Sequence, residues 1–183
     1  MKTHTKNTAG WKISPSQKKL LDALFKNIPI KNPHGVVDAG SGRTSIHYLA
    51  HRFKKTLITG VVYPGDDRKL KPILACVSED NYRIAQTDIQ KFNPKQKPEI
   101  VLAHLFLGEA TKFGRNTFPG VLKKLLSLPS RYLVIINLAS DNIDYFTLIR
   151  EIKKKGGIVS LAYTSTESGG NCIGMVIKLT GAQ

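Results

Sequence analysis

The 183-residue chain carries 28 Lys and Arg against 13 Asp and Glu, a formal net charge of +15, and 41% of its residues are hydrophobic. That length and hydrophobic content suit one globular domain, and no apolar run is long enough to cross a bilayer, so with no apolar signal region in Met1–Lys12 a cytoplasmic location is expected. A chain this basic attracts polyanions, which favours nucleic acid as a partner over a small anionic molecule or a membrane surface, although a lysine-rich solvated face explains the charge equally well.

Residues 1–32 are predicted to form a basic tail and one helix, ahead of a main domain at residues 33–183. Ser14 suits an N-cap and Pro15 suits the first helical position. The apolar residues that follow at helical spacing are Leu20, Leu21, Leu24, Phe25 and Ile28. This pattern predicts a helix that lies against the main sheet.

An apolar run that ends in Asp38 leads directly into two glycines, Gly40 and Gly42. Apolar residues at helical spacing then follow in segment 43–54, so a strand, a tight turn and a helix are predicted in succession. Glycines adopt positive φ readily and leave room for a ligand to approach the backbone. Because the first N–H groups of a helix lack intrahelical partners, this turn is expected to favour a polar ligand.

Two histidines on the predicted helix, His47 and His51, lie four residues apart and could share a metal ion. No third ligand accompanies them in a recognised pattern, and surface or partly packed histidines are the commoner case. The cysteines, Cys76 and Cys172, are far apart in the sequence and are expected to be reduced. No metal site is predicted.

The rest of the chain alternates apolar runs with helical patterns. Strands are predicted at 56–63, 82–87, 99–106 and 132–137, and helices at 66–77, 121–128 and 141–155. Two last strands, 158–164 and 172–179, flank a turn-rich segment, which favours an antiparallel pair at the sheet edge. The β-α repeats therefore predict a single α/β domain of three layers, a mostly parallel sheet between helices that closes with an antiparallel C-terminal hairpin.

Ligands in such a sheet bind beyond the carboxyl ends of the strands, where the first β-α turn lies. A dinucleotide fold favours a third glycine and an acid about twenty residues further on. The third glycine position holds Ser45, and the later region is Val61-Val62-Tyr63. The glycine pair alone therefore leaves the ligand open.

Segment Val36–Gly42 resembles the first motif of the class I S-adenosylmethionine-dependent methyltransferases, and Gln86–Ile89 resembles their later motif after the third strand. The resemblance covers residues from about 34 to 179 and implies a Rossmann-like sandwich with S-adenosylmethionine as cofactor. It implies that the turn passes under the cofactor, that Asp38 helps to position its methionine end, and that the acid of the later motif contacts the adenine. The cofactor-binding residues implied are Asp38, Ala39, Gly40, Gly42, Asp88 and Ile89, with Tyr63 a candidate to pack on the adenine.

Two departures from the family pattern bear on the chemistry. The second strand ends in Val62-Tyr63 without the acid that commonly holds the ribose hydroxyls. After the fourth strand the chain has His104-Leu-Phe-Leu-Gly-Glu109 where enzymes that methylate base amines carry an Asn/Asp-Pro-Pro-aromatic turn. His104 and Glu109 are the candidate catalytic residues by position, and a core histidine satisfied by the backbone is the alternative for His104.

The leading hypothesis is thus an S-adenosylmethionine-dependent methyltransferase, with RNA slightly preferred as acceptor because of the charge, or a small anionic substrate. A non-catalytic nucleic-acid-binding protein with the same fold is the alternative. An oxidoreductase would need the ribose acid that is absent after the second strand.

Overall fold

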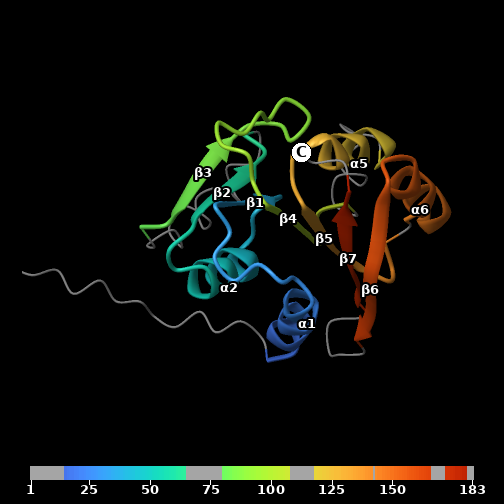
Figure 1. The fold of residues 1–183 in the computed structure, drawn as a ribbon, viewed down its shortest axis with the longest axis horizontal. Helices are drawn as coiled ribbons and strands as arrows, with labels where there is room; N and C mark the ends of the chain where they lie inside the picture. Colours follow the sequence, from blue (N-terminus) through green and yellow to red (C-terminus); the bar gives the residue numbers. More distant parts are fainter. Residues whose placement is uncertain (1–14, 65–79, 108–117, 142, 166–171, 181–183) are drawn as a thin grey trace, which may run out of the picture.

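The computed structural model describes residues 15–64, 80–107, 118–141, 143–165 and 172–180 (Figure 1). Its elements in chain order are α1 (Pro15–Lys26), β1 (Gly35–Ala39), α2 (Arg43–Arg52), β2 (Leu57–Val62), β3 (Tyr82–Gln86), β4 (Ile100–His104), α5 (Phe118–Ser127), β5 (Tyr132–Leu138), α6 (Tyr145–Lys154), β6 (Gly157–Ser165) and β7 (Cys172–Leu179). Among the described residues, no helix has the length and apolar character needed to span a membrane. The predicted helix at 66–77 lies outside the described ranges.

All seven strands form one sheet in the order β3-β2-β1-β4-β5-β7-β6. The first five pair in parallel, whereas β7 lies antiparallel between β5 and β6. The prediction of a mostly parallel sheet with an antiparallel C-terminal hairpin is therefore confirmed. Strand order reverses between β1 and β4, so the carboxyl ends of these two strands form the topological switch point at which such sheets bind ligands.

Helices cover both faces of the sheet, which confirms the three-layer sandwich. Figure 1 shows α1 and α2 on one side of the strands and α5 and α6 on the other. Successive strand residues point to opposite faces, so Val36 joins the core under α1 and α2, while Val37 joins the core under α5 and α6. Every residue of β1 is buried, because a central parallel strand is covered on both faces.

Helix α1 belongs to the first of these cores. Its inner face buries Leu20, Leu21, Leu24 and Phe25. Leu24 packs closely over β7, where a Cβ added to Gly174 would lie 2.8 Å from the Leu24 Cδ1 atom. The predicted helix of the N-terminal segment is confirmed, and the division of the chain at residue 32 stays a prediction.

Three predicted boundaries were wrong, each for a local reason. Strand β4 ends at His104 rather than 106 because Leu105 has a positive φ of 53° and turns the chain out of the sheet. Helix α5 begins at Phe118 because Pro119 lies in the first turn, where its missing N–H has no intrahelical partner to lose. Helix α6 begins at Tyr145 because the Asp144 side chain accepts a hydrogen bond from the Thr147 N–H at 3.0 Å.

Candidate functional site

The glycine turn joins β1 to α2 at the switch point. Gly40 has a φ of 70°, a conformation that strains residues with a Cβ. The N–H groups of Gly40 and Ser41 both donate to the carbonyl of Val61, at 3.0 and 3.1 Å. The turn is therefore tied to the end of β2 by its own backbone.

Ser45, which occupies the third glycine position of a dinucleotide motif, closes the start of α2. Its Oγ accepts a hydrogen bond from the Gly42 N–H at 3.1 Å and donates to the Gly42 carbonyl at 3.0 Å. Ser45 is fully buried. Its side chain makes the hydrogen bond at the start of the helix that an N-cap side chain normally makes. The N–H groups of Gly40, Ser41 and Gly42 are thus all bonded within the chain, and what these residues offer a ligand is chiefly the shape of the turn.

The two glycines of the turn have different surroundings. A Cβ added to Gly42 would meet no atom of the described residues within 4 Å, so within that part of the chain open space borders the start of α2. A Cβ added to Gly40 would lie 2.7 Å from the Cγ of Phe106, whose ring packs directly on the glycine. The turn therefore leaves room for a ligand beside Gly42, while Phe106 covers Gly40.

Asp38 lies behind this turn and is fully buried. Its Oδ2 accepts a hydrogen bond from the Tyr82 hydroxyl at 2.5 Å. Its Oδ1 has no hydrogen-bond partner in the part of the chain that the structure describes. Burial raises the pKa of Asp38 from 3.8 to about 6, although the nearby Ser45 hydroxyl, the Tyr82 hydrogen bond and the nearby Ser41 hydroxyl oppose the shift.

Tyr82 reaches Asp38 from β3, two strands away. The strand between them, β2, places Gly60 directly opposite Asp38 in the register. A Cβ on Gly60 would lie 2.7 Å from both the hydroxyl oxygen and Cε1 of Tyr82, so only a glycine leaves space for the ring to cross. Ser41 joins the group: its Oγ donates to the Asp38 carbonyl at 2.9 Å and lies 3.1 Å from the Tyr82 hydroxyl.

Sequence reasoning missed both Tyr82 and Gly60. The available signal was a glycine inside a β-branched strand, which marks a close approach of another group. It does not say which side chain makes the approach.

The carboxyl ends of β2 and β3 bring the other predicted site residues to the same edge. Asp88 is half-buried, and its Oδ1 accepts a hydrogen bond from the Gln90 N–H at 2.9 Å. Ile89 is buried against the second core, and so is Ala39. Tyr63, just past β2, is 39% exposed. Their roles toward a ligand stay predictions.

Of the two candidate catalytic residues, the structure describes His104 but not Glu109. His104 is the last residue of β4 and is half-buried, and burial lowers its pKa from 6.5 to about 4. Its imidazole is therefore neutral near pH 7. Glu109 lies outside the described residues. Within the described ranges, no group of three or more His, Cys, Asp or Glu side chains could hold a metal ion.

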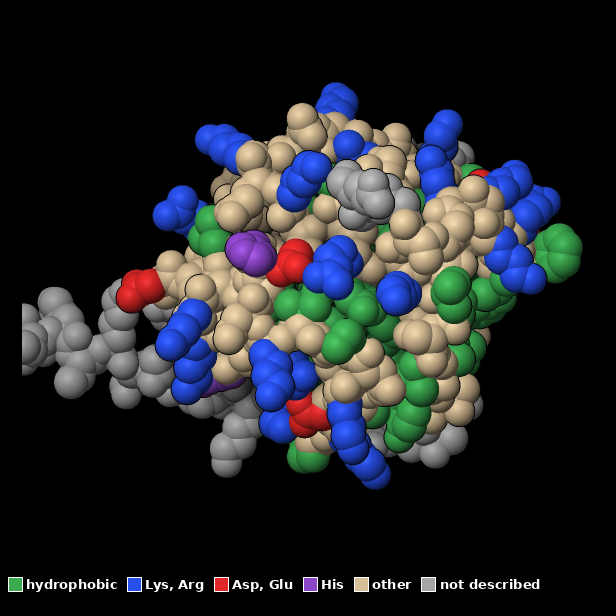
Figure 2. Space-filling view, viewed as in Figure 1, with side chains coloured by type: hydrophobic (Ala, Val, Ile, Leu, Met, Phe, Trp, Pro, Cys, Tyr) green, Lys and Arg blue, Asp and Glu red, His purple; other side chains and the backbone are tan. Residues whose placement is uncertain are grey.

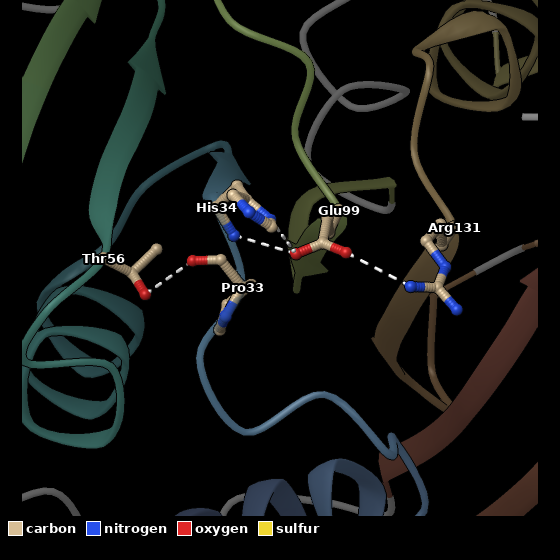
Figure 3. Close-up of polar contacts among 5 residues, drawn as sticks. All are labelled: Pro33, His34, Thr56, Glu99 and Arg131. Carbon is tan, nitrogen blue, oxygen red and sulfur yellow. Dashed lines mark hydrogen bonds and ion pairs between the residues drawn. The ribbon is translucent and has the colours of Figure 1, made fainter. Parts of the chain in front are cut away.

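A second polar cluster lies at the opposite edge, where the parallel strands begin (Figure 3). Glu99, just before β4, accepts hydrogen bonds from the backbone N–H of His34 at 2.8 Å and, with Nδ1 protonated, from its ring at 3.0 Å. Its other oxygen lies 3.3 Å from the Arg131 guanidinium. Burial raises the pKa of Glu99, but the His34 and Arg131 contacts outweigh it and lower the pKa below 4.5. Nearby, Thr56 Oγ1 donates to the Pro33 carbonyl at 2.8 Å.

No protein-family model and no curated protein sequence matches the chain. Solved structures do match. A candidate RNA methyltransferase from Pyrococcus horikoshii has 17% identity and a TM-score of 0.69 over 91% of this chain and 83% of that one. The N-methyltransferase NodS from Bradyrhizobium japonicum, solved with S-adenosylhomocysteine, has 11% identity and a TM-score of 0.68 over 96% and 94%. The magnesium protoporphyrin IX methyltransferase from Synechocystis, solved with S-adenosylmethionine, has 16% identity and a TM-score of 0.64 over 90% and 78%.

The chain has the fold of the S-adenosylmethionine-dependent methyltransferases. Two features of this methyltransferase fold fit a cofactor that carries a cationic amino group. Among the described residues, open space borders Gly42 and the buried Oδ1 of Asp38 has no donor, whereas buried polar atoms nearly always have a partner. Phe106 on Gly40 is the feature that fits least well.

The basic residues are not gathered at one place on the face shown in Figure 2. Lys and Arg side chains are spread around that face, some of them adjoining, with hydrophobic side chains between the groups. A spread of this kind attracts polyanions without marking one binding track.

Proposed function

We propose that the chain is an S-adenosylmethionine-dependent methyltransferase. The observation that carries this proposal is the glycine turn between β1 and α2, which lies at the topological switch point of a methyltransferase fold and has open space beside Gly42. Ligands of open α/β sheets bind at that point. In the bound state the cofactor supplies an activated methyl group for transfer to a nucleophile.

Different residues at the carboxyl edge of the sheet are proposed to bind different parts of the cofactor. Ala39, Gly40 and Gly42 form the turn under the cofactor, and Asp38 receives its cationic methionine end. Asp88 and Ile89, which follow β3, are proposed to bind the adenine, and the exposed ring of Tyr63 is proposed to pack on it. Each of these roles is part of the proposal.

His104 is proposed to serve the acceptor. Methyl transfer depends chiefly on alignment of the nucleophile, and a general base is needed only for some acceptors. A neutral imidazole with a pKa of about 4 accepts a proton only weakly near pH 7. The site therefore suits an acceptor that is nucleophilic without strong base assistance. Glu109 stays a second candidate base.

RNA is the favoured acceptor. The net charge of +15 attracts a polyanion, and one structural neighbour is a candidate RNA methyltransferase. A small anionic substrate is the other class that the charge supports. A cytoplasmic location is also part of this proposal.

A ligand titration tests the proposal. S-adenosylmethionine or S-adenosylhomocysteine at a hundred times its dissociation constant should stabilise the protein by about 2.7 kcal/mol, which corresponds to a rise in Tm of roughly 5–10 °C. Transfer of a tritiated methyl group into RNA, protein and small-molecule fractions then identifies the acceptor. A shift with NAD and none with either sulfur ligand would refute the proposal.

The second candidate is a non-catalytic nucleic-acid-binding protein that keeps the fold. The packing of Phe106 on Gly40 favours it, as does the absence of an acid at Val62-Tyr63. Such a protein should bind single-stranded RNA with an affinity that falls steeply between 50 and 200 mM salt, whether or not S-adenosylhomocysteine is present. RNA binding of this kind without any thermal shift from the sulfur ligands would select this candidate.

A further inference from the structure

Tyr82, the first residue of β3, makes a hydrogen bond that crosses the neighbouring strand. It is 3% exposed, and its hydroxyl lies 2.5 Å from Oδ2 of Asp38. The contact crosses β2 and requires Gly60, because any larger residue at that position would occupy the space of the ring. A glycine in a strand loses packing and gains flexibility in the unfolded chain, so the crossing costs stability.

The contact leaves half of the carboxyl group without a partner. Oδ2 is satisfied by Tyr82, while Oδ1 has no donor among the described residues. A buried carboxylate oxygen without a partner is costly, and apolar side chains would fill the same space more cheaply. The arrangement therefore contributes little to folding, and its use is to be sought at the adjoining turn.

The geometry also couples the carboxyl group to the turn. Ser41 donates to the backbone carbonyl of Asp38 and approaches the same Tyr82 hydroxyl. With Oδ2 held from the side of β3, the carboxyl group cannot exchange its two oxygens freely. Oδ1 is thereby left as the buried oxygen that has no donor among the described residues.

We propose that Tyr82 is a positioning residue, whose hydroxyl holds Oδ2 of Asp38 so that Oδ1 is presented to a cationic group of the ligand at the glycine turn. This inference rests on the proposed function, since S-adenosylmethionine and S-adenosylhomocysteine both carry an α-ammonium group. Tyr82 should therefore affect the binding of that ammonium group alone and not the binding of the adenosine portion of the ligand.

Isothermal titration with two ligands tests this selectivity. S-adenosylhomocysteine carries the ammonium group, whereas 5′-methylthioadenosine has the adenosine and the sulfur without it. Tyr82→Phe should weaken S-adenosylhomocysteine binding about tenfold or more and leave 5′-methylthioadenosine binding within about twofold of the wild type, because loss of one organised charged contact is typically worth that much. Should Tyr82→Phe fail to fold, Asp38→Asn is expected to show the same selective loss.

Tyr48→Phe is the matched control. Tyr48 is also buried, and its hydroxyl donates to an aspartate, Asp22 Oδ1 on α1, at 3.0 Å. That variant should leave both affinities unchanged. Equal losses for both ligands in Tyr82→Phe, or no loss for either, overturn the inference while the proposed function stands. A wild-type protein that binds neither ligand overturns both.

Discussion

The two edges of the parallel sheet hold two carboxylates in opposite states. Glu99, at the amino edge, has both oxygens in contact with donors, and its pKa is lowered. Asp38, at the carboxyl edge, has one oxygen bonded and one without a partner in the described part of the chain, and its pKa is raised to about 6. One carboxylate is stabilised in its charged form by the fold, and the other is destabilised.

We relate this difference to two roles: Glu99 holds strands of the sheet together, whereas Asp38 belongs to the proposed ligand site. At the amino edge Glu99 connects the chain segments that precede β1, β4 and β5, so its bonds fix where these strands begin. At the carboxyl edge the fold tolerates an uncompensated carboxylate next to a glycine turn. Unfavourable groups of this kind concentrate at functional sites, where a ligand completes them.

The largest expected effect comes from a substitution at Gly60 that fills the space through which Tyr82 reaches Asp38. Gly60→Ala places a Cβ 2.7 Å from the Tyr82 hydroxyl and even closer to Ser41, so one of these groups must move. We expect a loss of about 3 kcal/mol or more in the free energy of unfolding, measured by urea titration. The matched variant Gly42→Ala meets no atom within 4 Å and should cost less than about 1 kcal/mol. Equal costs for the two variants would contradict this account of Gly60.

The next largest effect is a pH dependence of the free energy of unfolding that is caused by the titration of Asp38. Because its pKa is raised from 3.8 to about 6 in the folded state, the stability that its protonated form contributes is present below pH 3.8 and is lost as the pH rises through 6. Asparagine does not titrate, so Asp38→Asn removes this loss of stability. The free energy of unfolding of the variant, relative to that of the wild type, should therefore rise by on the order of 2 kcal/mol from pH 4 to pH 7.

Because His104 also titrates in this pH range, the free energy of unfolding of the variant must be compared with that of the wild type at each pH. Its pKa is lowered from 6.5 to about 4, so its contribution is present above pH 6.5 and is lost as the pH falls through 4. That slope opposes the slope from Asp38 and is the same in both proteins. A stability difference between variant and wild type that stays flat from pH 4 to pH 7 would show that Asp38 does not titrate as described.

Local patterns in the sequence were sufficient to predict most elements of this fold. The apolar run before Gly40, the continuous hydrophobic segment of β5 and the turn-rich segment before β7 each depend on neighbouring residues alone. The glycine turn was predicted for the same reason, since its two glycines follow a strand directly. Its place at the switch point followed from the order of β-α units.

The contacts that distinguish the two edges could not be predicted in this way. Tyr82 and Asp38 are 44 residues apart, and they meet only because β2 lies between β3 and β1 and carries a glycine at the matching position. Glu99 and His34 are 65 residues apart and meet because β4 pairs directly with β1. Both contacts depend on strand order and register, which no local pattern encodes.

At the amino edge, Glu99→Gln tests the holding role. The variant keeps the shape but loses the charge, so the contacts with His34 and Arg131 weaken, at a cost of about 1 kcal/mol at pH 7. Because the pKa of Glu99 is lowered below 4.5, this contribution is present above that pH and is lost as the pH falls through the lower folded value. The difference from wild type should therefore shrink on acidification, opposite to Asp38→Asn. Binding of S-adenosylhomocysteine should be unchanged.

The smallest effect is expected for Arg131→Gln. The Arg131 side chain is 58% exposed, so water and salt screen its pairing with Glu99, and the guanidinium is held at only one 3.3 Å contact. We expect less than about 0.5 kcal/mol at low salt and no measurable effect at 1 M NaCl, from urea titrations at both concentrations. A loss as large as that of Glu99→Gln, persisting at 1 M NaCl, would mean that Arg131 rather than the His34 backbone is the main partner of Glu99.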